Sequence, residues 1–384
     1  MSVILTLNAG SSSLKFAVYS AVAEPDLLQT GQVENLGPVA RLEIKGGETR
    51  EIGPADHAVA LTAILQAVEP VLDGRVVAGV GHRIVHGGKS FGDPVALTNA
   101  TLAQLDALVP LAPLHQPNNL AVVRAARTIF PDAVQIGCFD TAFHRGHPFV
   151  NDAFALPRHL YDQGVRRYGF HGLSYDYVSG VLARDWPKLA QGRVAICHLG
   201  NGASMCAVAN GHSIGSTMGF SALDGLPMGT RCGQLDPGVL LYLMDQGMAR
   251  AQIEQMLYRD SGLRGLSGIS HDMRTLLASD DPRAAQAIDY YVFRIRRELG
   301  AMAAILGGLD GVVFTGGIGE NAAPIRTRVI EGMAFLGLAL NPAANETGAI
   351  EIGSGPAQVL VIRTDEERVI ARAVAAALPS ATAT

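Results

Sequence analysis

Cysteine is scarce in this sequence, and its spacing matches no common metal or redox motif. Four of the 384 residues are cysteine, and none of them forms a CxxC pair. A disulfide framework and a structural zinc site are therefore both disfavoured. We expect free thiols, as in a cytosolic protein, at Cys138, Cys197, Cys206 and Cys232.

Long runs of basic or apolar residues are also missing. The formal net charge is −5 and lysine and arginine are dispersed, so nucleic acid is not an expected partner. The first ten residues lack the basic region and the long apolar stretch of a signal peptide. The most apolar later window, 301–319, contains Asp310 and several glycines. We expect no membrane span and a cytoplasmic protein.

Apolar residues and glycine are abundant by contrast. Hydrophobic residues make up 48% of a chain of 384, which is enough for sizeable cores and favours two domains. The 44 glycines gather in short clusters after apolar runs. Such clusters are typical of tight loops at strand ends, where the backbone must approach a ligand closely.

Short apolar runs rich in β-branched residues predict strands between these loops. A three- and four-residue apolar repeat predicts a helix over Ala287–Leu306. The pattern indicates an α/β fold with mixed sheets. The predicted strands are Val3–Leu7, Leu14–Tyr19, Val194–Leu199, Met205–Ala209, Gly311–Thr315 and Val359–Arg363.

Two passages look like one architectural unit used twice. VILTLNAGSSSLKFAVYS and VAICHLGNGASMCAVANG both consist of an apolar strand, a turn of Asn with small residues, and a second apolar strand. A glycine hairpin is common in any protein, so this repeat only suggests a duplication.

The first of these turns has the composition of a phosphate-binding loop. Backbone N–H groups of small residues, the hydroxyls of Ser11 and Ser13, and the charge of Lys15 can all face an anion. The turn is not a P-loop, because GxxxxGK[ST] is absent and a strand follows it. An ordinary hairpin turn is the alternative.

The second and third glycine turns are His198–Ser204 and Thr315–Asn321. The third contains GGIG but no GxGxxG, and no acidic ribose partner follows at the Rossmann distance. A dinucleotide site is therefore disfavoured. Three such loops in separate parts of the chain suggest a nucleotide held between two domains.

Taken together and in order, nine strings resemble the acetate kinase and related short-chain acyl kinase family over nearly the whole chain. They are NAGSSSLKF at 8–16, GHRIVHGG at 81–88, APLHQPN at 112–118, FDTAFH at 139–144, YGFHGLSY at 168–175, HLGNGAS at 198–204, MGTRCGQLDPG at 228–238, GGIGEN at 316–321 and TDEE at 364–367.

The resemblance implies two ribonuclease H-like domains, each a βββαβαβα unit, with a nucleotide cleft between them. It places residues 1–140 plus 369–384 in the first domain, with a returning C-terminal helix, and 141–368 in the second. It implies reversible phosphoryl transfer from ATP to acetate, giving acetyl phosphate and ADP. It also implies a homodimer, and Mg²⁺ as the cofactor with Mn²⁺ as a substitute.

The chemistry of a carboxylate acceptor differs from that of a sugar. A carboxylic acid with a pKa near ~4 is already an anionic nucleophile at neutral pH and needs no base. The enzyme must instead neutralise charge on the transferring phosphoryl group. Arg83 and Arg231 suit this need, and the resemblance places both at that group. Taken alone, either arginine would more often be a surface ion-pair partner.

The resemblance assigns further roles around the transferring group. His171 matches a histidine that donates to the phosphoryl group, whereas His115 and His198 match supporting histidines. A structural role is a serious alternative for His198. Asp140 closes the apolar run 133–139 and matches an essential residue. Because no base is needed, we expect it to orient Arg231 or the water shell of the metal.

The same resemblance gives the metal site. Glu366 is the expected magnesium carboxylate, and Asn8 is expected to help through a coordinated water. The TDEE string also fits a capping box in which Thr364 caps the following helix and Glu367 stands three residues on. Both readings can hold together.

Matching positions also predict the nucleotide and acyl sites. The nucleotide residues are Ser11, Ser13, Lys15, His198, Leu199, Gly200, Asn201, Gly202, Asp272, Met273, Arg274, Gly317, Ile318, Glu320, Gly319 and Asn321. The acyl and substrate residues are Arg83, Val85, Leu114, His115, Phe170 and Ala222.

Ala222 departs from the family pattern, in which many members have proline. The smaller side chain widens the expected pocket. We predict acetate as the best substrate, propionate as a weaker one and butyrate as a poor one. One methylene in an apolar pocket changes the free energy of binding by roughly 1–3 kcal/mol, so we expect modest discrimination between acetate and propionate. A propionate-preferring acyl kinase is the alternative.

Two other classes of protein fit the sequence less well than an acyl kinase. In a sugar kinase of the same superfamily Asp140 would be the base, but a neutral acceptor has no need of two arginines. An actin-like nucleotide switch is disfavoured because no peptide-binding domain or polymerisation insert is evident in 384 residues. The sequence does not determine the physiological direction, the regulation or the nucleotide preference.

Overall fold

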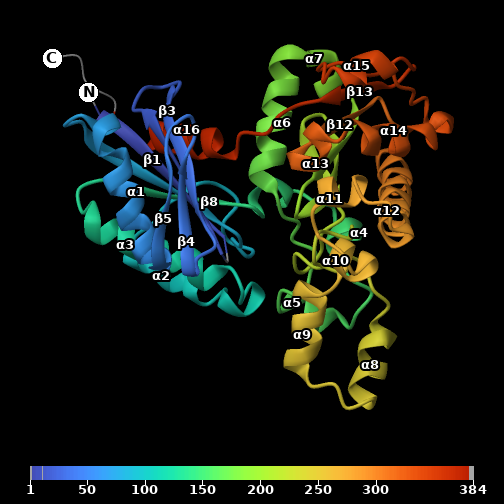
Figure 1. Cartoon of the computed structure of the whole chain (residues 1–384), viewed down its shortest axis with the longest axis horizontal. Coiled ribbons are helices and arrows are strands. Elements are labelled where there is room, and N and C mark those ends of the chain that lie inside the picture. Colours follow the sequence, from blue (N-terminus) through green and yellow to red (C-terminus); the bar gives the residue numbers. More distant parts are fainter. Residues whose placement is uncertain (1, 11, 380–384) are drawn as a thin grey trace. The chain divides into compact units, whose positions relative to one another are not determined.

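The computed structural model describes residues 2–10 and 12–379. The chain divides into two compact units: unit 1 contains 1–142 and 365–384, and unit 2 contains 143–364. Figure 1 shows the elements of each unit along the chain. No helix in the described ranges is long and apolar enough to cross a membrane.

Unit 1 is built on a mixed sheet whose described strands run in the order β5-β4-β3-β2-β1-β6-β8-β7. The strands are β1 (Ser2–Ala9), β2 (Leu14–Ser20), β3 (Leu27–Glu34), β4 (Gly37–Ile44), β5 (Thr49–Ala55), β6 (Val76–Ile84), β7 (Val95–Ala96) and β8 (Val134–Phe139). The helices are α1 (His57–Leu72), α2 (Asn99–Asp106), α3 (Gln116–Ile129) and α16 (Glu366–Ala377).

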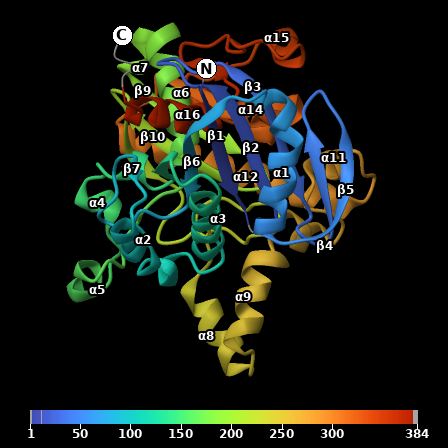
Figure 2. The ribbon, with the colours of Figure 1, turned by 90° about the vertical axis from the view of Figure 1, so that its left-hand side faces the viewer.

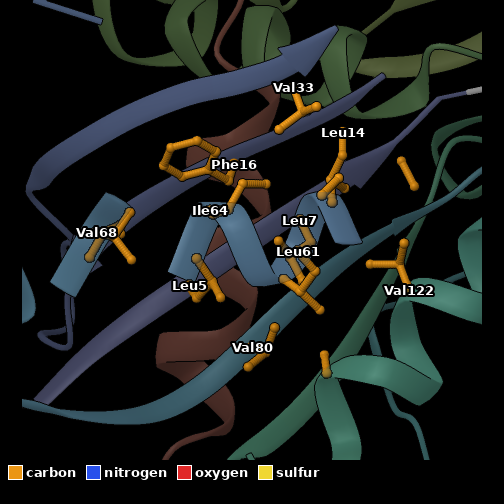
Figure 3. Close-up of a cluster of buried hydrophobic side chains, with 14 of the residues drawn as sticks. Leu5, Leu7, Leu14, Phe16, Val33, Leu61, Ile64, Val68, Val80 and Val122 are labelled. Atoms are coloured by element: carbon orange, nitrogen blue, oxygen red, sulfur yellow. The ribbon is translucent and has the colours of Figure 1, made fainter. Parts of the chain in front are cut away.

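The two faces of this sheet pack against different helices. Alternate residues of β1 and β6, such as Leu5 and Val80, join Leu61 and Ile64 of α1 in one buried cluster (Figure 3). The opposite face of β6 carries glycine: a Cβ on Gly81 would lie 2.3 Å from the Ile370 side chain of α16. Glycine therefore lets α16 lie directly against the sheet.

Unit 2 has a smaller mixed sheet, ordered β11-β10-β9-β12-β13 in the described chain. Its strands are β9 (Arg193–Leu199), β10 (Ala203–Ala209), β11 (His212–Ser216), β12 (Gly311–Thr315) and β13 (Gln358–Val361). Its helices are α4 (Phe149–Asp152), α5 (Arg158–Asp162), α6 (Gly172–Asp185), α7 (Pro187–Ala190), α8 (Pro237–Asp245), α9 (Arg250–Arg259), α10 (Gly262–Ser267), α11 (Met273–Leu277), α12 (Pro282–Leu306), α13 (Gly316–Asn321), α14 (Ala323–Glu331) and α15 (Pro342–Glu346).

The two sheets share one strand order, which confirms the predicted α/β fold with duplicated ribonuclease H-like sheets. In each, a central strand pairs antiparallel with the second strand, which pairs antiparallel with the third. The central strand also pairs parallel with the fourth, and the fourth with the fifth. Strands β1, β2, β3, β6 and β8 thus correspond to β9, β10, β11, β12 and β13.

Insertions account for the differences between the units. A β4–β5 hairpin extends the first sheet, and helices α8 to α11 precede α12 in the second. Figure 2 shows α8 and α9, in yellow, extending away from the strands of their own unit. After the last main strand of each sheet the chain continues into the other unit. Beyond β8 and the short helices α4 and α5, α6 packs on β9, whereas α16 follows β13 and packs on β1 and β6.

Two details of the predicted elements were wrong. Helix α12 begins at Pro282, five residues before the predicted start, because Asp281 accepts the Arg283 N–H at 2.8 Å and caps the helix. The segment Gly316–Asn321, predicted as a loop, is the short helix α13. Its first residue, Gly316, has φ +75°, a left-handed conformation that lets the chain leave β12 and turn directly into a helix.

A buried histidine in unit 1 makes stability depend on pH. The Nε2 of His82 on β6 lies 2.8 Å from the Gln135 amide oxygen, and Nδ1 has no partner among the described residues. Burial lowers the pKa of His82 from 6.5 to about 4. The folded state holds the ring neutral, so its stabilisation is present above the unfolded pKa and is lost as the pH falls towards 4.

We predict that protonation of His82 on unfolding lowers the free energy of unfolding by about 2 kcal/mol when the pH falls from 7 to 5. Urea unfolding of unit 1, followed at both pH values, measures this loss. His82→Gln keeps a polar partner for Gln135 and should reduce the pH dependence by about that amount. His144 and His147 of unit 2 are also buried with lowered pKa values, so they leave a pH dependence in both proteins. An unchanged pH dependence in His82→Gln would contradict the assignment.

Candidate active site

The carboxyl ends of three neighbouring strands of unit 1 bring Asn8, Arg83 and Asp140 together. Asn8 of β1 is opposite Arg83 of β6 in register, and Asp140 follows β8 directly. The Arg83 Nε donates to Asp140 Oδ1 at 2.9 Å and its second terminal nitrogen to Oδ2 at 2.6 Å. Its other terminal nitrogen donates to Asn8 Oδ1 at 3.0 Å.

The Arg83–Asp140 contact is an ion pair. The Asp140 side chain is 2% exposed and that of Arg83 20%. Burial alone would lower the pKa of Arg83, but the carboxylates of Asp140, Glu366 and Glu367 outweigh it and raise that pKa above its ordinary value. Arg83 therefore stays a cation. Burial raises the pKa of Asp140, but the paired hydrogen bonds and the charge of Arg83 oppose that rise and favour the carboxylate form. The partner of Asp140 within unit 1 is thus Arg83, where the sequence suggested Arg231 or the water shell of the metal.

The first turn of α16 adds two carboxylates to the same edge. Asn8 Nδ2 donates to Glu367 Oε1 at 3.5 Å. Partial burial and the nearby Glu366 carboxylate raise the pKa of Glu367, whereas Lys15 of β2 opposes the rise. The helix is capped by Asp365, which accepts the Arg368 N–H at 3.0 Å. The predicted capping by Thr364 was therefore wrong.

The carboxylates and the amide at this edge could hold a magnesium ion. No group of three His, Cys, Asp or Glu side chains in the described ranges forms a metal site by itself. Magnesium does not require one, since it keeps several waters and binds one or two carboxylates together with substrate phosphates. The mutual repulsion of Glu366 and Glu367 is the kind of strain that a divalent cation relieves.

Buried amides that the sequence did not single out shape the loop after Arg83. Asn119 of α3 accepts the Val85 N–H at 3.0 Å and donates to the Ala9 carbonyl at 2.7 Å. Gln116 accepts from the His86 N–H and donates to the His86 carbonyl. Gln116 lies within the APLHQPN string and Asn119 follows it directly, so their place in the sequence was the available signal.

The other predicted residues of unit 1 lie around these strands. Val85 is buried at 6% exposure, and His115 and Leu114 lie just before α3. Lys15 is exposed on β2, in register with Asn8. The carbonyl of Ser13 accepts the Gly10 N–H at 2.8 Å, which closes the first glycine turn. Ser11 lies outside the described residues.

In unit 2, the turn between β9 and β10 brings a histidine and an arginine together. A Cβ built on Gly202 would lie 3.2 Å from His171 Nε2 and 3.9 Å from a terminal nitrogen of Arg231. Arg231 also donates to the Ala222 carbonyl at 3.2 Å. A histidine ring nitrogen and a guanidinium therefore lie beside Gly202, which has no side chain to cover its backbone N–H, an arrangement suited to an anion.

His198 lies against His171. The two rings stack with centroids 4.3 Å apart, and the His198 Nδ1 lies 2.8 Å from Ser174 Oγ. Phe170, which precedes His171, is buried, and its carbonyl contacts the His144 ring at 3.0 Å. His198, Phe170 and Ala222 thus lie in the unit that holds His171 and Arg231.

A cavity of about 560 Å³ in unit 2 gathers half of the predicted nucleotide residues. Those that line it are Gly200, Asn201, Asp272, Met273, Arg274, Gly317, Ile318 and Asn321. The sequence missed His271, Leu277, Ala322 and Pro324, which complete the lining. The cavity lining does not include His198, Leu199, Gly202, Gly319 or Glu320.

Glu320 and Arg326 act on the backbone of α13. Glu320 Oε1 accepts the N–H groups of Gly316 and Thr364, at 2.9 and 3.1 Å. Arg326 is 2% exposed and donates to the carbonyls of Gly319 and Glu320 at 2.9 Å. The two side chains fix both ends of the helix, so that Ile318 can line the cavity.

Comparisons with known proteins all indicate the same family. The acetokinase family model matches residues 3–372. The acetate kinase of Methylocella silvestris is 52% identical, with 96% of each chain covered. A propionate kinase structure from Francisella tularensis has a TM-score of 0.91 at 35% identity, and an acetate kinase structure from Porphyromonas gingivalis has 0.89 at 36%. Coverage is 97% of this chain and 99% of the first structure, and 99% of this chain and 100% of the second. The chain therefore belongs to the acetokinase family.

Proposed function

We propose that this protein transfers the γ-phosphoryl group of ATP to acetate, reversibly, giving acetyl phosphate and ADP. Membership of the acetokinase family confirms the predicted class, a phosphotransferase with a carboxyl acceptor (EC 2.7.2.1). The observation that carries the chemistry is the Arg83–Asp140 pair. Its carboxylate is engaged by a guanidinium, so it offers an acceptor no free base. A carboxylate acceptor needs none.

Cations and donors act on the transferring group in this proposal. Arg83 and Arg231 bind carboxylate and phosphoryl oxygens, and His171 donates a hydrogen bond to the phosphoryl group. Together they neutralise the charge that spreads over its equatorial oxygens during in-line transfer. Asp140 acts through Arg83, because it fixes the direction in which the guanidinium points. His115 has a supporting role beside the acid.

Mg²⁺, with Mn²⁺ as a substitute, is the proposed cofactor. Glu366 would hold it and Asn8 would help through a coordinated water, with Glu367 adjacent. When bound, the ion supplies charge neutralisation to the β- and γ-phosphate oxygens of ATP. The 560 Å³ cavity would receive the adenosine part of the nucleotide. Lys15 and the turn His198–Gly202 would face its phosphates.

The assembly and boundaries of the protein are also proposals. The proposed domains are 1–140 plus 369–384 and 141–368. We also propose a homodimer and a cytoplasmic location. Exposed apolar side chains support the dimer: Leu241, Tyr242 and Met244 of α8 are 50–64% exposed, and Phe293 of α12 is 59% exposed. Such side chains are typical of protein interfaces.

Hydroxylamine trapping of the acyl phosphate tests the proposed activity. With MgATP, we expect hydroxamate from acetate, less from propionate and little from butyrate, with kcat/KM falling by about ten-fold per methylene. Ala222→Val narrows the pocket and should penalise propionate more than acetate. A preference for propionate would contradict the predicted order. No trapped product, from protein that binds ATP, would instead favour a sugar kinase or a nucleotide switch.

Substitution of Asp140 tests its role. Asp140→Asn should lower kcat by about 10²–10³, because Arg83 loses the partner that orients it. In an Arg83→Met background the same substitution should cost little, since no guanidinium is left to orient. Asp310→Asn, in the exposed pair with Arg193, is the control. Near-normal turnover of Asp140→Asn, or an equal further loss in the Arg83→Met background, would contradict the role.

A further inference from the structure

Behind the His171 ring, two buried hydroxyl groups form a hydrogen-bonded series with it. Its Nδ1 lies 2.8 Å from Ser204 Oγ on β10, and that oxygen lies 2.5 Å from the Tyr175 hydroxyl on α6. Both Ser204 and Tyr175 are 0% exposed. Among the described residues, the hydroxyls of Ser204 and Tyr175 make hydrogen bonds only to each other and to the His171 ring.

Counting hydrogens leaves one satisfactory arrangement. If Tyr175 donates to Ser204 and Ser204 donates to the His171 Nδ1, every hydroxyl hydrogen has an acceptor. If His171 instead carries its proton on Nδ1 and donates to Ser204, one hydroxyl hydrogen has no acceptor among the described residues, at a place where both hydroxyl residues are 0% exposed. Either Tyr175 or Ser204 would hold that orphan hydrogen, which is costly when buried.

We propose that Ser204, supported by Tyr175, fixes His171 as the tautomer that carries its proton on Nε2. The inference rests on the proposed function, to which it adds two positioning residues. Nε2 is the atom that lies beside Gly202, next to the Arg231 guanidinium. Ser204 and Tyr175 therefore make His171 a hydrogen-bond donor at the point where the phosphoryl group is proposed to bind.

Two further observations fit a ring held in one state. His171 has φ +59°, a left-handed conformation that is strained for a residue with a side chain and is often retained at functional sites. Burial raises the pKa of Tyr175 well above 10, so its hydroxyl keeps the hydrogen that it donates. The backbone fixes where the ring lies, and the two hydroxyls fix which nitrogen carries the proton.

The tautomer can be measured without turnover. In protein with ¹⁵N-labelled histidine, long-range ¹H–¹⁵N spectra distinguish the two tautomers, and a His171→Gln sample identifies the ring. We expect the Nε2–H pattern in the wild type at pH 8. In Ser204→Ala the Nδ1 loses its donor, and a mixture of tautomers is expected. A wild-type ring with its proton on Nδ1 would overturn the inference even if acetyl phosphate is formed.

Kinetics then test whether the tautomer matters. Ser204→Ala should lower kcat about ten-fold, with KM for acetate and MgATP changed by less than about two-fold. Tyr175→Phe should lower kcat by about three-fold in the wild type and not at all in Ser204→Ala, because Tyr175 acts only through that hydroxyl. An equal cost in both backgrounds, or an unchanged kcat in Ser204→Ala, would overturn the proposal.

Two control substitutions remove buried hydroxyls elsewhere in unit 2. Tyr291 and Ser179 each bury a hydroxyl that has no partner among the described residues. Tyr291→Phe and Ser179→Ala should therefore leave kcat and the His171 spectrum unchanged. A loss of kcat in these variants equal to that in Tyr175→Phe and Ser204→Ala would show a general packing effect and would overturn the proposal. Absence of acetyl phosphate in the wild type would overturn the proposed function, while the tautomer assignment would stand on its spectrum.

Discussion

The ion pair between Arg83 and Asp140 is the interaction on which the account of this protein depends. A buried carboxylate without a partner would be costly, and a buried guanidinium without one equally so. Paired, they place a fixed cation at the carboxyl ends of β1, β6 and β8, with Asn8 on its other side. Cations of this kind favour an anionic acceptor, and they leave Asp140 unsuited to remove a proton from a neutral one.

The duplicated sheet explains why each unit has a functional edge of the same kind. In both, the central antiparallel hairpin turns tightly on small residues next to the parallel strand that follows in the sheet. Unit 1 places Arg83 beside this turn, and unit 2 places His171 and Arg231 beside Gly202. Helices α6 and α16 each follow a strand of one unit and pack on the other, so the chain connects the two units twice.

Much of the fold could be predicted because apolar β-branched runs and glycine turns are local signals, and the strands of both hairpins were found within two residues of their ends. The partner of Asp140 could not be predicted, because the sequences of β6 and β8 do not determine their register, and that register brings Arg83 next to Asp140. Helix α13 was missed because glycine-rich composition predicts a loop, and only the side chains of Glu320 and Arg326 fix it as a helix. Ser204 closes the predicted turn His198–Ser204, but nothing in the sequence indicated that it would contact His171.

Transfer of ¹⁸O from labelled acetate tests most directly the claim that a carboxylate oxygen of the acceptor attacks the phosphoryl group. With MgATP and [¹⁸O₂]acetate, the acetyl phosphate formed should carry ¹⁸O in the bridge between carbon and phosphorus. Its ³¹P resonance should show the upfield isotope shift of one directly bonded ¹⁸O. A product whose phosphorus lacks this shift, or no acetyl phosphate at all, would contradict the account.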